Sequence, residues 1–180
     1  MATILLGVTG SIAAYKACEL TRLFIKDGHA VHVIMTQAAT RFVTPLTFRT
    51  LSRNPVSVDL FDEPDEWMPG HISFAERADV LVIAPCSANV IAKLAHGLAD
   101  DMLASTALAT KAPLVIAPAM NTGMWEHPAT QSNLGTLAAR GATFVEAGTG
   151  DLACGTSGKG RMAEPQEIFG AVMRRLAAKG

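Results

Sequence analysis

The stretch Pro113-Leu114-Val115-Ile116-Ala117-Pro118-Ala119-Met120-Asn121-Thr122-Gly123-Met124-Trp125 decides the fold prediction, because it joins an apolar run to a turn. Residues 113–117 are typical of a buried strand, and a helical pattern follows over residues 128–140. In an open α/β sheet, ligands bind outside the carboxyl ends of the strands, where Asn121 would lie. Its carboxamide can donate to a carboxylate or accept from an amide, but Asn is also a common turn residue. Both interpretations of Asn121 stay open on this stretch alone.

The same succession of short apolar runs and helical patterns extends along the chain. Strands are expected at residues 3–8, 30–35, 80–84, 114–117 and 143–146, with a short one around 56–58, and helices at residues 13–26, 36–52, 71–77, 90–95, 100–110, 128–140 and 165–179. Strands that alternate with helices predict one α/β domain over residues 1–180, a parallel sheet with helices on both faces. The loops at residues 9–12, 36–41, 85–89 and 118–123 should then meet at one edge of the sheet.

Composition excludes several classes of function. Of the 180 residues, 49% are hydrophobic and 17% are charged, which indicates a sheet buried on both faces or sizeable subunit interfaces. The net charge of -1 gives no basic footprint for nucleic acid. No apolar run approaches a membrane span and no signal peptide is recognisable. Three widely spaced cysteines favour a reducing cytoplasm, and the five histidines have no metal-ligand spacing.

Two strand exits carry small residues and hydroxyl groups. In the first, Gly10 permits a tight turn, and Ser11 precedes a helix whose amides could bind phosphate. An ordinary N-capping serine would look the same. The second exit, residues 85–89, repeats the pattern with Ser87 and Asn89, while Cys86 is better explained as a packed small side chain than as a nucleophile. Two such exits in one sheet suit a planar cofactor with a phosphate tail, such as FMN.

Two further features could carry chemistry. His71 follows Pro69-Gly70 and could act as an acid or base near neutral pH, although an exposed histidine in the first turn of a helix is the simpler explanation. Residues 147–162 contain five glycines and no periodicity, so we expect a loop without regular structure. Loops of this kind are disordered or act as lids. The nearby cations Lys159 and Arg161 would favour a thiolate at Cys154, unless that cysteine is incidental.

In their order and spacing, these pieces resemble the homo-oligomeric flavin-containing cysteine decarboxylases over nearly the whole chain. The matching motifs are residues 9–16 (Thr-Gly-Ser-Ile-Ala-Ala-Tyr-Lys), 71–72, 78–79, 84–89, 91–95, 97–101, 118–125, 128–131 and 153–162. The resemblance implies a three-layer Rossmann-like (flavodoxin-like) fold that binds FMN and assembles as a trimer, or as a dodecamer of trimers, with the active site at the subunit interface.

Residue roles follow from the resemblance. His71 and Cys154 match catalytic groups, and Asn121 matches the asparagine that binds the substrate carboxylate. The expected substrate contacts are Met120, Asn121, Ala153, Lys159 and Arg161. The expected cofactor contacts are Gly10, Ser11, Ile12, Thr36, Ser87, Ala88, Asn89, Val90 and Ala119. Three positions depart from the family pattern, namely Arg77, Cys86 and Val90, and the last departure weakens any role of that side chain in binding FMN.

The implied reaction is the FMN-dependent decarboxylation of 4'-phospho-N-pantothenoylcysteine to 4'-phosphopantetheine in coenzyme A biosynthesis. In the family mechanism the cysteine thiol is oxidised to a thioaldehyde, CO2 leaves to give an enethiolate, and Cys154 protonates the product. A synthetase domain often follows in bacterial relatives, so the chain is either a stand-alone enzyme or a fragment. Decarboxylation of a peptide's C-terminal cysteine is the nearest alternative. A flavin prenyltransferase and a non-catalytic FMN-binding subunit are less favoured.

Overall fold

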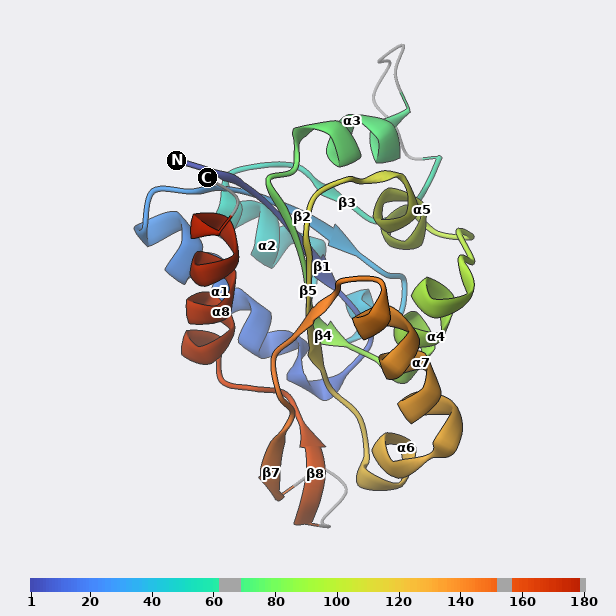
Figure 1. Ribbon diagram of the computed structural model, residues 1–180. Helices are drawn as coiled ribbons and strands as arrows, with labels where there is room; N and C mark the ends of the chain where they lie inside the picture. The colour runs from blue at the N-terminus through green and yellow to red at the C-terminus, as the bar shows by residue number, and fades with distance from the viewer. Residues whose placement is uncertain (62–68, 152–156, 179–180) are drawn as a thin grey trace.

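A six-stranded parallel sheet forms the centre of the computed structural model, which describes residues 1–61, 69–151 and 157–178 (Figure 1). The strand order is β3-β2-β1-β4-β5-β6, so the direction of winding reverses between β1 and β4. The strands are β1 (Thr3–Val8), β2 (Ala30–Met35), β3 (Val56–Ser57), β4 (Val80–Cys86), β5 (Leu114–Pro118) and β6 (Thr143–Phe144). In such sheets the reversal point leaves a crevice at the carboxyl ends of the two strands.

Alternate side chains of the strands enter two separate cores. In β1, Ile4, Leu6 and Val8 pack on one face, whereas Leu5 packs on the other. The first face is covered by α1 (Lys16–Lys26), α2 (Pro45–Ser52) and α8 (Pro165–Ala177); the second is covered by α3 (Gly70–Arg77), α4 (Ala88–His96), α5 (Met102–Ala109) and α7 (Pro128–Ala139). Each fully buried large side chain contributes about 1.5–3 kcal/mol. The predicted three-layer α/β fold is confirmed.

The structure corrects the sequence prediction at the carboxyl edge of the sheet. Strand β4 continues through Cys86, which had been assigned to an exit turn, and α4 begins at Ala88. The first helix starts as a 3-10 turn, η1 (Ile12–Tyr15), and the helix expected over residues 36–52 divides into η2 (Ala39–Arg41) and α2. A short helix, α6 (Thr122–Glu126), occupies what had been predicted as a turn.

The glycine-rich segment was predicted wrongly in its described parts. Residues Gly148–Asp151 and Ser157–Arg161 form β7 and β8, an antiparallel pair that projects from the main sheet below β5 (Figure 1). Ala153 and Cys154 lie outside the described residues. In the described part of the chain, none of the helices is both long enough and apolar enough to cross a bilayer.

Candidate functional site

A cavity of about 570 Å3 lies at the carboxyl ends of β1, β4 and β5, next to the reversal point of the sheet. This volume is typical of a site for a cofactor or a small ligand. The residues that line it are Gly10, Ser11, Ile12, Ala13, Tyr15, Lys16, Ser87, Ala88, Ala119, Met120, Asn121, Met124, Gly160, Arg161 and Met162. Three of the four loops expected at this edge therefore contribute to one cavity, together with β8.

Thr9 joins the two strand exits across the reversal point. Its side chain is fully buried, and its hydroxyl donates to the carbonyl oxygen of Pro85 (2.8 Å) while accepting from the amide of Ser87 (2.9 Å). These bonds fix the exit of β1 against that of β4, so that Gly10 and Ser87 face a common space. Sequence reasoning missed this role, although a hydroxyl at the end of an apolar run was its visible signal.

The first strand exit approaches its neighbours too closely for any side chain at Gly10. A Cβ atom there would lie 2.6 Å from Cβ of Ala38, in the loop that follows β2. Thr36 starts that loop, and its hydroxyl accepts from the amide of Ala39 (3.3 Å). Thr36 is not among the residues that line the cavity, so this loop supports the wall without forming it.

Both serines of the strand exits cap helices, and they line the cavity as well. Ser11 Oγ accepts from the amide of Ala13 (3.2 Å), and Ser87 Oγ accepts from the amide of Val90 (3.4 Å). Each bond uses an oxygen lone pair and not the hydroxyl hydrogen, so the same group can donate to a ligand oxygen. The capping and ligand-binding interpretations of these serines are therefore compatible.

Asn121 likewise has a structural role and a place in the cavity. It is the N-cap of α6, where its Oδ1 accepts from the amide of Gly123 (2.8 Å). Because Oδ1 faces this amide, the Nδ2 group is the part of the carboxamide suited to a ligand carboxylate. The turn interpretation is correct, and it leaves the carboxylate-binding interpretation standing.

Strand β8 is held against the Asn121 segment by two contacts. The amide of Met120 donates to the carbonyl oxygen of Gly160 (2.9 Å), and the Lys159 ammonium lies 5.5 Å from the ring centroid of Trp125. Lys159 is therefore turned to Trp125 and is not a lining residue, whereas Arg161 is. The described end of the glycine-rich segment is therefore packed against residues 120–125.

The charge on the cavity wall is positive. Lys16 and Arg161 line the cavity, and none of its lining residues in the described part of the chain is acidic. A cavity with two cations, hydroxyl donors and an apolar wall of alanines and methionines suits an anionic ligand with an apolar body. Lys16, Tyr15 and Met124 were not among the predicted contacts, although residues 9–16 and 118–125 contain them.

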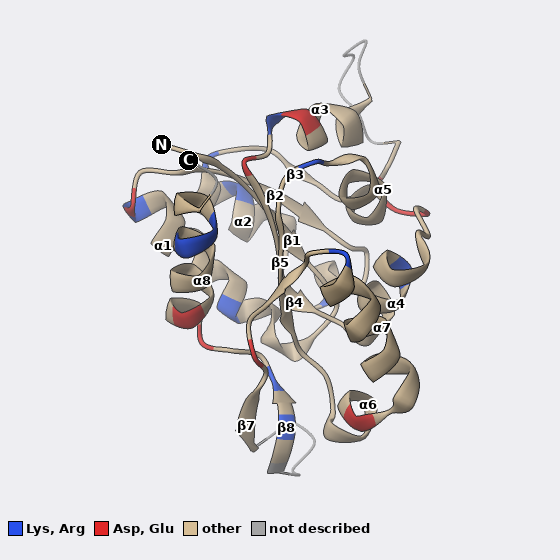
Figure 2. Cartoon of the chain, viewed as in Figure 1, with Lys and Arg blue, Asp and Glu red and all other residues tan. Residues whose placement is uncertain are grey.

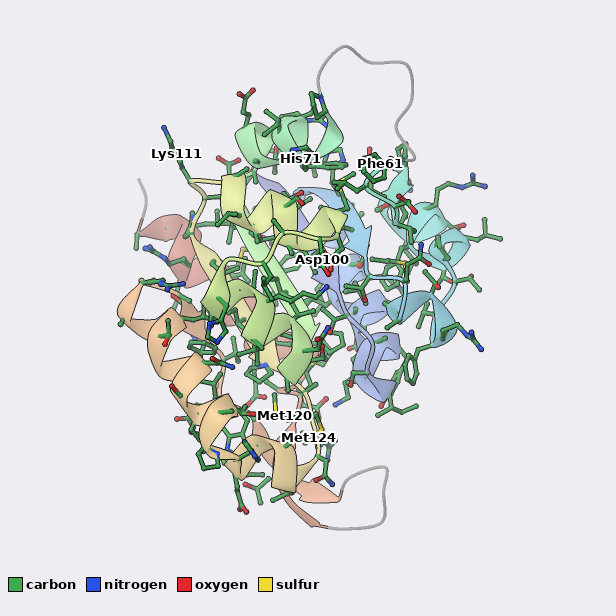
Figure 3. The ribbon with its side chains drawn as sticks, turned by 90° about the vertical axis from the view of Figure 1, so that its right-hand side faces the viewer. Phe61, His71, Asp100, Lys111, Met120 and Met124 are labelled. Atoms are coloured by element: carbon green, nitrogen blue, oxygen red, sulfur yellow. The ribbon has the colours of Figure 1, made fainter. Side chains whose placement is uncertain are left out.

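His71 lies far from this cavity within one copy of the chain. It is at the start of α3, which precedes β4 and therefore sits at the amino edge of the sheet, and Figure 3 shows it at the opposite end of the molecule from Met120 and Met124. Its Nδ1 atom is buried, with no hydrogen-bond partner among the described residues. Within a single chain, His71 therefore does not face Asn121.

Other predicted contacts also lie outside the cavity wall. Asn89 is exposed, and Val90 is buried in the core between α4 and the sheet, so neither is a lining residue. Cys86 is fully buried, and burial raises the pKa of its thiol far above the usual range. A thiol that stays protonated is a poor nucleophile, in agreement with a packing role.

Comparison with known proteins agrees with this geometry. The model of the family described as Flavoprotein matches residues 1–177. The "Coenzyme A biosynthesis bifunctional protein CoaBC" of Bacillus subtilis is 52% identical over 174 residues, which are 97% of this chain and 43% of that protein. The chain thus spans less than half the length of this relative. A "Probable phosphopantothenoylcysteine decarboxylase" of Streptococcus mutans is 45% identical over 175 residues, 96% of this chain and 98% of that one.

Solved structures show the same fold. A cysteine-to-serine variant of a PPC decarboxylase in complex with pantothenoylaminoethenethiol superposes with a TM-score of 0.86 at 34% identity, covering 99% of both chains. The FMN-dependent cysteine decarboxylase SpaF superposes with a TM-score of 0.85 at 30% identity, covering 99% of this chain and 97% of that one. With its family model matched over nearly its whole length, the chain belongs to the Flavoprotein family.

Proposed function

We propose that this chain is an FMN-dependent decarboxylase that converts 4'-phospho-N-pantothenoylcysteine to 4'-phosphopantetheine in coenzyme A biosynthesis. One observation carries the proposal: the Gly10–Ile12 exit, the Ser87 exit and the Asn121 segment meet in a single cavity. The two relatives named for coenzyme A biosynthesis and for this decarboxylation support the substrate. Since the chain covers only part of the bifunctional relatives, a link to a synthetase partner is part of the proposal.

The residues at the reversal point fit FMN. Gly10 and Ser11 offer a close backbone approach and a hydroxyl donor of the kind that phosphates bind. Ser87, Ala88 and Ala119 present small side chains, which leave room for a flat ring between the exits of β4 and β5. FMN bound there supplies reversible two-electron oxidation of the substrate's thiol-bearing carbon, which creates the electron sink that decarboxylation requires.

The chain's own residues would bind and orient the substrate. Asn121 is proposed to hold the departing carboxylate through Nδ2, while its Oδ1 stays bonded to Gly123 and fixes the amide plane. A neutral donor suits this task, because a cation would stabilise the carboxylate more than the CO2 that it becomes. Cys154, on the segment that joins β7 to β8, is proposed to donate the proton that completes the product, with Met120 and Ala153 as further substrate contacts.

His71 is proposed to reach the cavity from a neighbouring copy of the chain, where it would act as the base at the substrate thiol. Its position at the amino edge of the sheet supports this, as does its buried Nδ1 without a partner among the described residues. Exposed apolar side chains flank the cavity, including Ile12 and Tyr15, and Phe61 is exposed on the same part of the molecule as His71 (Figure 3). Repeated head-to-tail contacts of this kind form a ring when the rotation between copies closes, and the proposed trimer, or dodecamer of trimers, is such an assembly.

The test is to incubate the purified protein with phosphopantothenoylcysteine or, separately, with a peptide that ends in cysteine. We expect CO2 release and 4'-phosphopantetheine by mass spectrometry from the first substrate, from a protein that carries flavin absorbance. Product from the peptide alone would replace the proposed substrate with the alternative one. A flavin-containing protein that decarboxylates neither would overturn the proposed function.

A further inference from the structure

Glu164 joins the two cations of the cavity wall. Its Oε1 and Oε2 accept from Lys16 Nζ at 2.8 and 2.9 Å, and Oε1 also accepts from Arg161 Nη2 at 2.8 Å. Lys16 begins α1, Arg161 ends β8, and Glu164 is the N-cap of α8, so one carboxylate links three elements that are distant in the sequence. Figure 2 shows a basic position at the end of β8 and acidic positions where α8 begins.

The arrangement brings two like charges together at a ligand cavity. Lys16 and Arg161 both line the cavity and Glu164 does not, so the carboxylate holds them from behind. The side chain of Lys16 is only 11% exposed, which restricts it more than an ordinary surface lysine. Without the shared carboxylate, two adjacent cations would repel each other and separate.

We propose that Glu164 is a positioning residue that fixes Lys16 and Arg161 as a paired-cation seat for a phosphate monoester in the cavity. The proposal rests on the proposed function, in which both FMN and 4'-phospho-N-pantothenoylcysteine carry such a group. A phosphate dianion has three acceptor oxygens, so it matches two cationic donors held side by side better than a carboxylate does. A peptide that ends in cysteine carries no such phosphate, so it would leave a seat for the substrate phosphate empty.

The carboxylate stays charged in this setting. Hydrogen bonding to the Lys16 ammonium, followed by the charges of Lys16 and Arg161, lowers the pKa of Glu164. The remaining charged neighbour on its helix, Glu167, uses its carboxylate to accept from the backbone amide of Glu164 (2.9 Å) and bonds neither cation in the described part of the chain. Glu167 is therefore a matched control for the start of the helix: it is the same residue type, it forms a capping box with Glu164, and its side chain bonds neither cation of the seat in the described part of the chain.

Positioning and simple electrostatics predict opposite signs for Glu164→Gln. If Glu164 only competed with the phosphate for the cations, removing its charge would tighten phosphate binding. If it positions them, the cations separate and phosphate binding weakens by at least about tenfold, the size of one lost charge-assisted hydrogen bond. The sign of the change therefore decides between the two roles.

The experiment uses purified holoprotein of wild type, Glu164→Gln, Glu167→Gln and Lys16→Gln. One arm measures the rate at which FMN fluorescence appears on dilution, which reports the flavin phosphate. The other measures KM for phosphopantothenoylcysteine relative to its dephosphorylated form, which reports the substrate phosphate. We expect Glu164→Gln and Lys16→Gln to change the same arm by at least about tenfold, and Glu167→Gln to match wild type.

The arm that responds identifies the phosphate that the seat binds. The inference is overturned if Glu164→Gln leaves both arms at wild-type values, if it tightens phosphate binding, or if Lys16→Gln acts on the other arm. Equal effects of Glu167→Gln would make the change a general effect on the start of α8, and would also overturn it. Failure of the proposed function is detected separately, because the wild-type protein would then not decarboxylate phosphopantothenoylcysteine. In that case the FMN release rate still tests the role of Glu164.

Discussion

At the scale of single residues, the site reuses side chains for two purposes. Ser11, Ser87 and Asn121 each accept a backbone hydrogen bond that starts a helix, and each lines the cavity. The first amides of a helix need a polar side chain as an acceptor, because they have no partner within the helix. A capping residue can therefore lie beside a ligand while its acceptor oxygen stays hydrogen-bonded to the backbone. The capping role explains why sequence patterns alone leave the function of these residues open.

Asn121→Asp separates the two roles of Asn121. Aspartate caps a helix as well as asparagine does, so the thermal unfolding temperature should stay within a degree or two. The Nδ2 donor is replaced by a negative charge that repels the substrate carboxylate, so kcat/KM should fall by about 100-fold or more, equivalent to about 2.7 kcal/mol. Steady-state kinetics checks this against Asn133→Asp, an amide-to-acid change on α7 outside the cavity. Unchanged kcat/KM would leave Asn121 with the capping role alone.

At the scale of elements, the sequence predicted those strands and helices whose residue pattern is typical of only one kind of structure. The apolar runs predicted the four longer strands of the main sheet within a few residues, because a parallel strand that is buried on both faces must be apolar throughout. The β7–β8 pair was missed, because glycine-rich strands carry no alternation. Strand β8 also bonds Met120, in a segment that its own sequence pattern cannot indicate. Thr9 was missed for the same reason: its partners lie on another strand.

Gly160→Ala should detach β8 from the Asn121 segment. Gly160 has φ +133°, which disfavours any side chain, and a Cβ there would collide with the carbonyl oxygen of Met120. We expect decarboxylase activity to fall by at least about tenfold and the Met120 amide, which donates to Gly160, to exchange its hydrogen faster. Gly135→Ala is the control: it lies in α7 with nothing near its Cβ position, and should stabilise the protein by about 0.5–1 kcal/mol. Wild-type protection of Met120 in Gly160→Ala would contradict this account of β8.

At the scale of the whole molecule, one chain holds the parts of the proposed site at its two ends. The sheet places residues 10–16, 87–88 and 119–124 at the carboxyl edge, whereas His71 is at the amino edge (Figure 3). Sequence order cannot show this, because His71 stands between two segments that do reach the cavity. A site that needs both ends must be composed from two copies, which ties activity to assembly.

Mixing two inactive variants tests the composite site. Asn121→Asp and His71→Asn should each form flavin-containing oligomers without decarboxylase activity. When the two are co-expressed with different tags and the hybrids are isolated, a site can pair the intact cavity of one copy with the intact His71 of the next. In every isolated trimer that contains both variants, one of the three interfaces pairs the two intact parts, so activity should reach about a third of wild type. Co-expression of Asn121→Asp with Gly10→Asp, two lesions in the same cavity, should restore nothing. If the His71 hybrids are as inactive as their parents, His71 does not act on a neighbouring copy, and its role in the reaction has to be abandoned or placed within one chain.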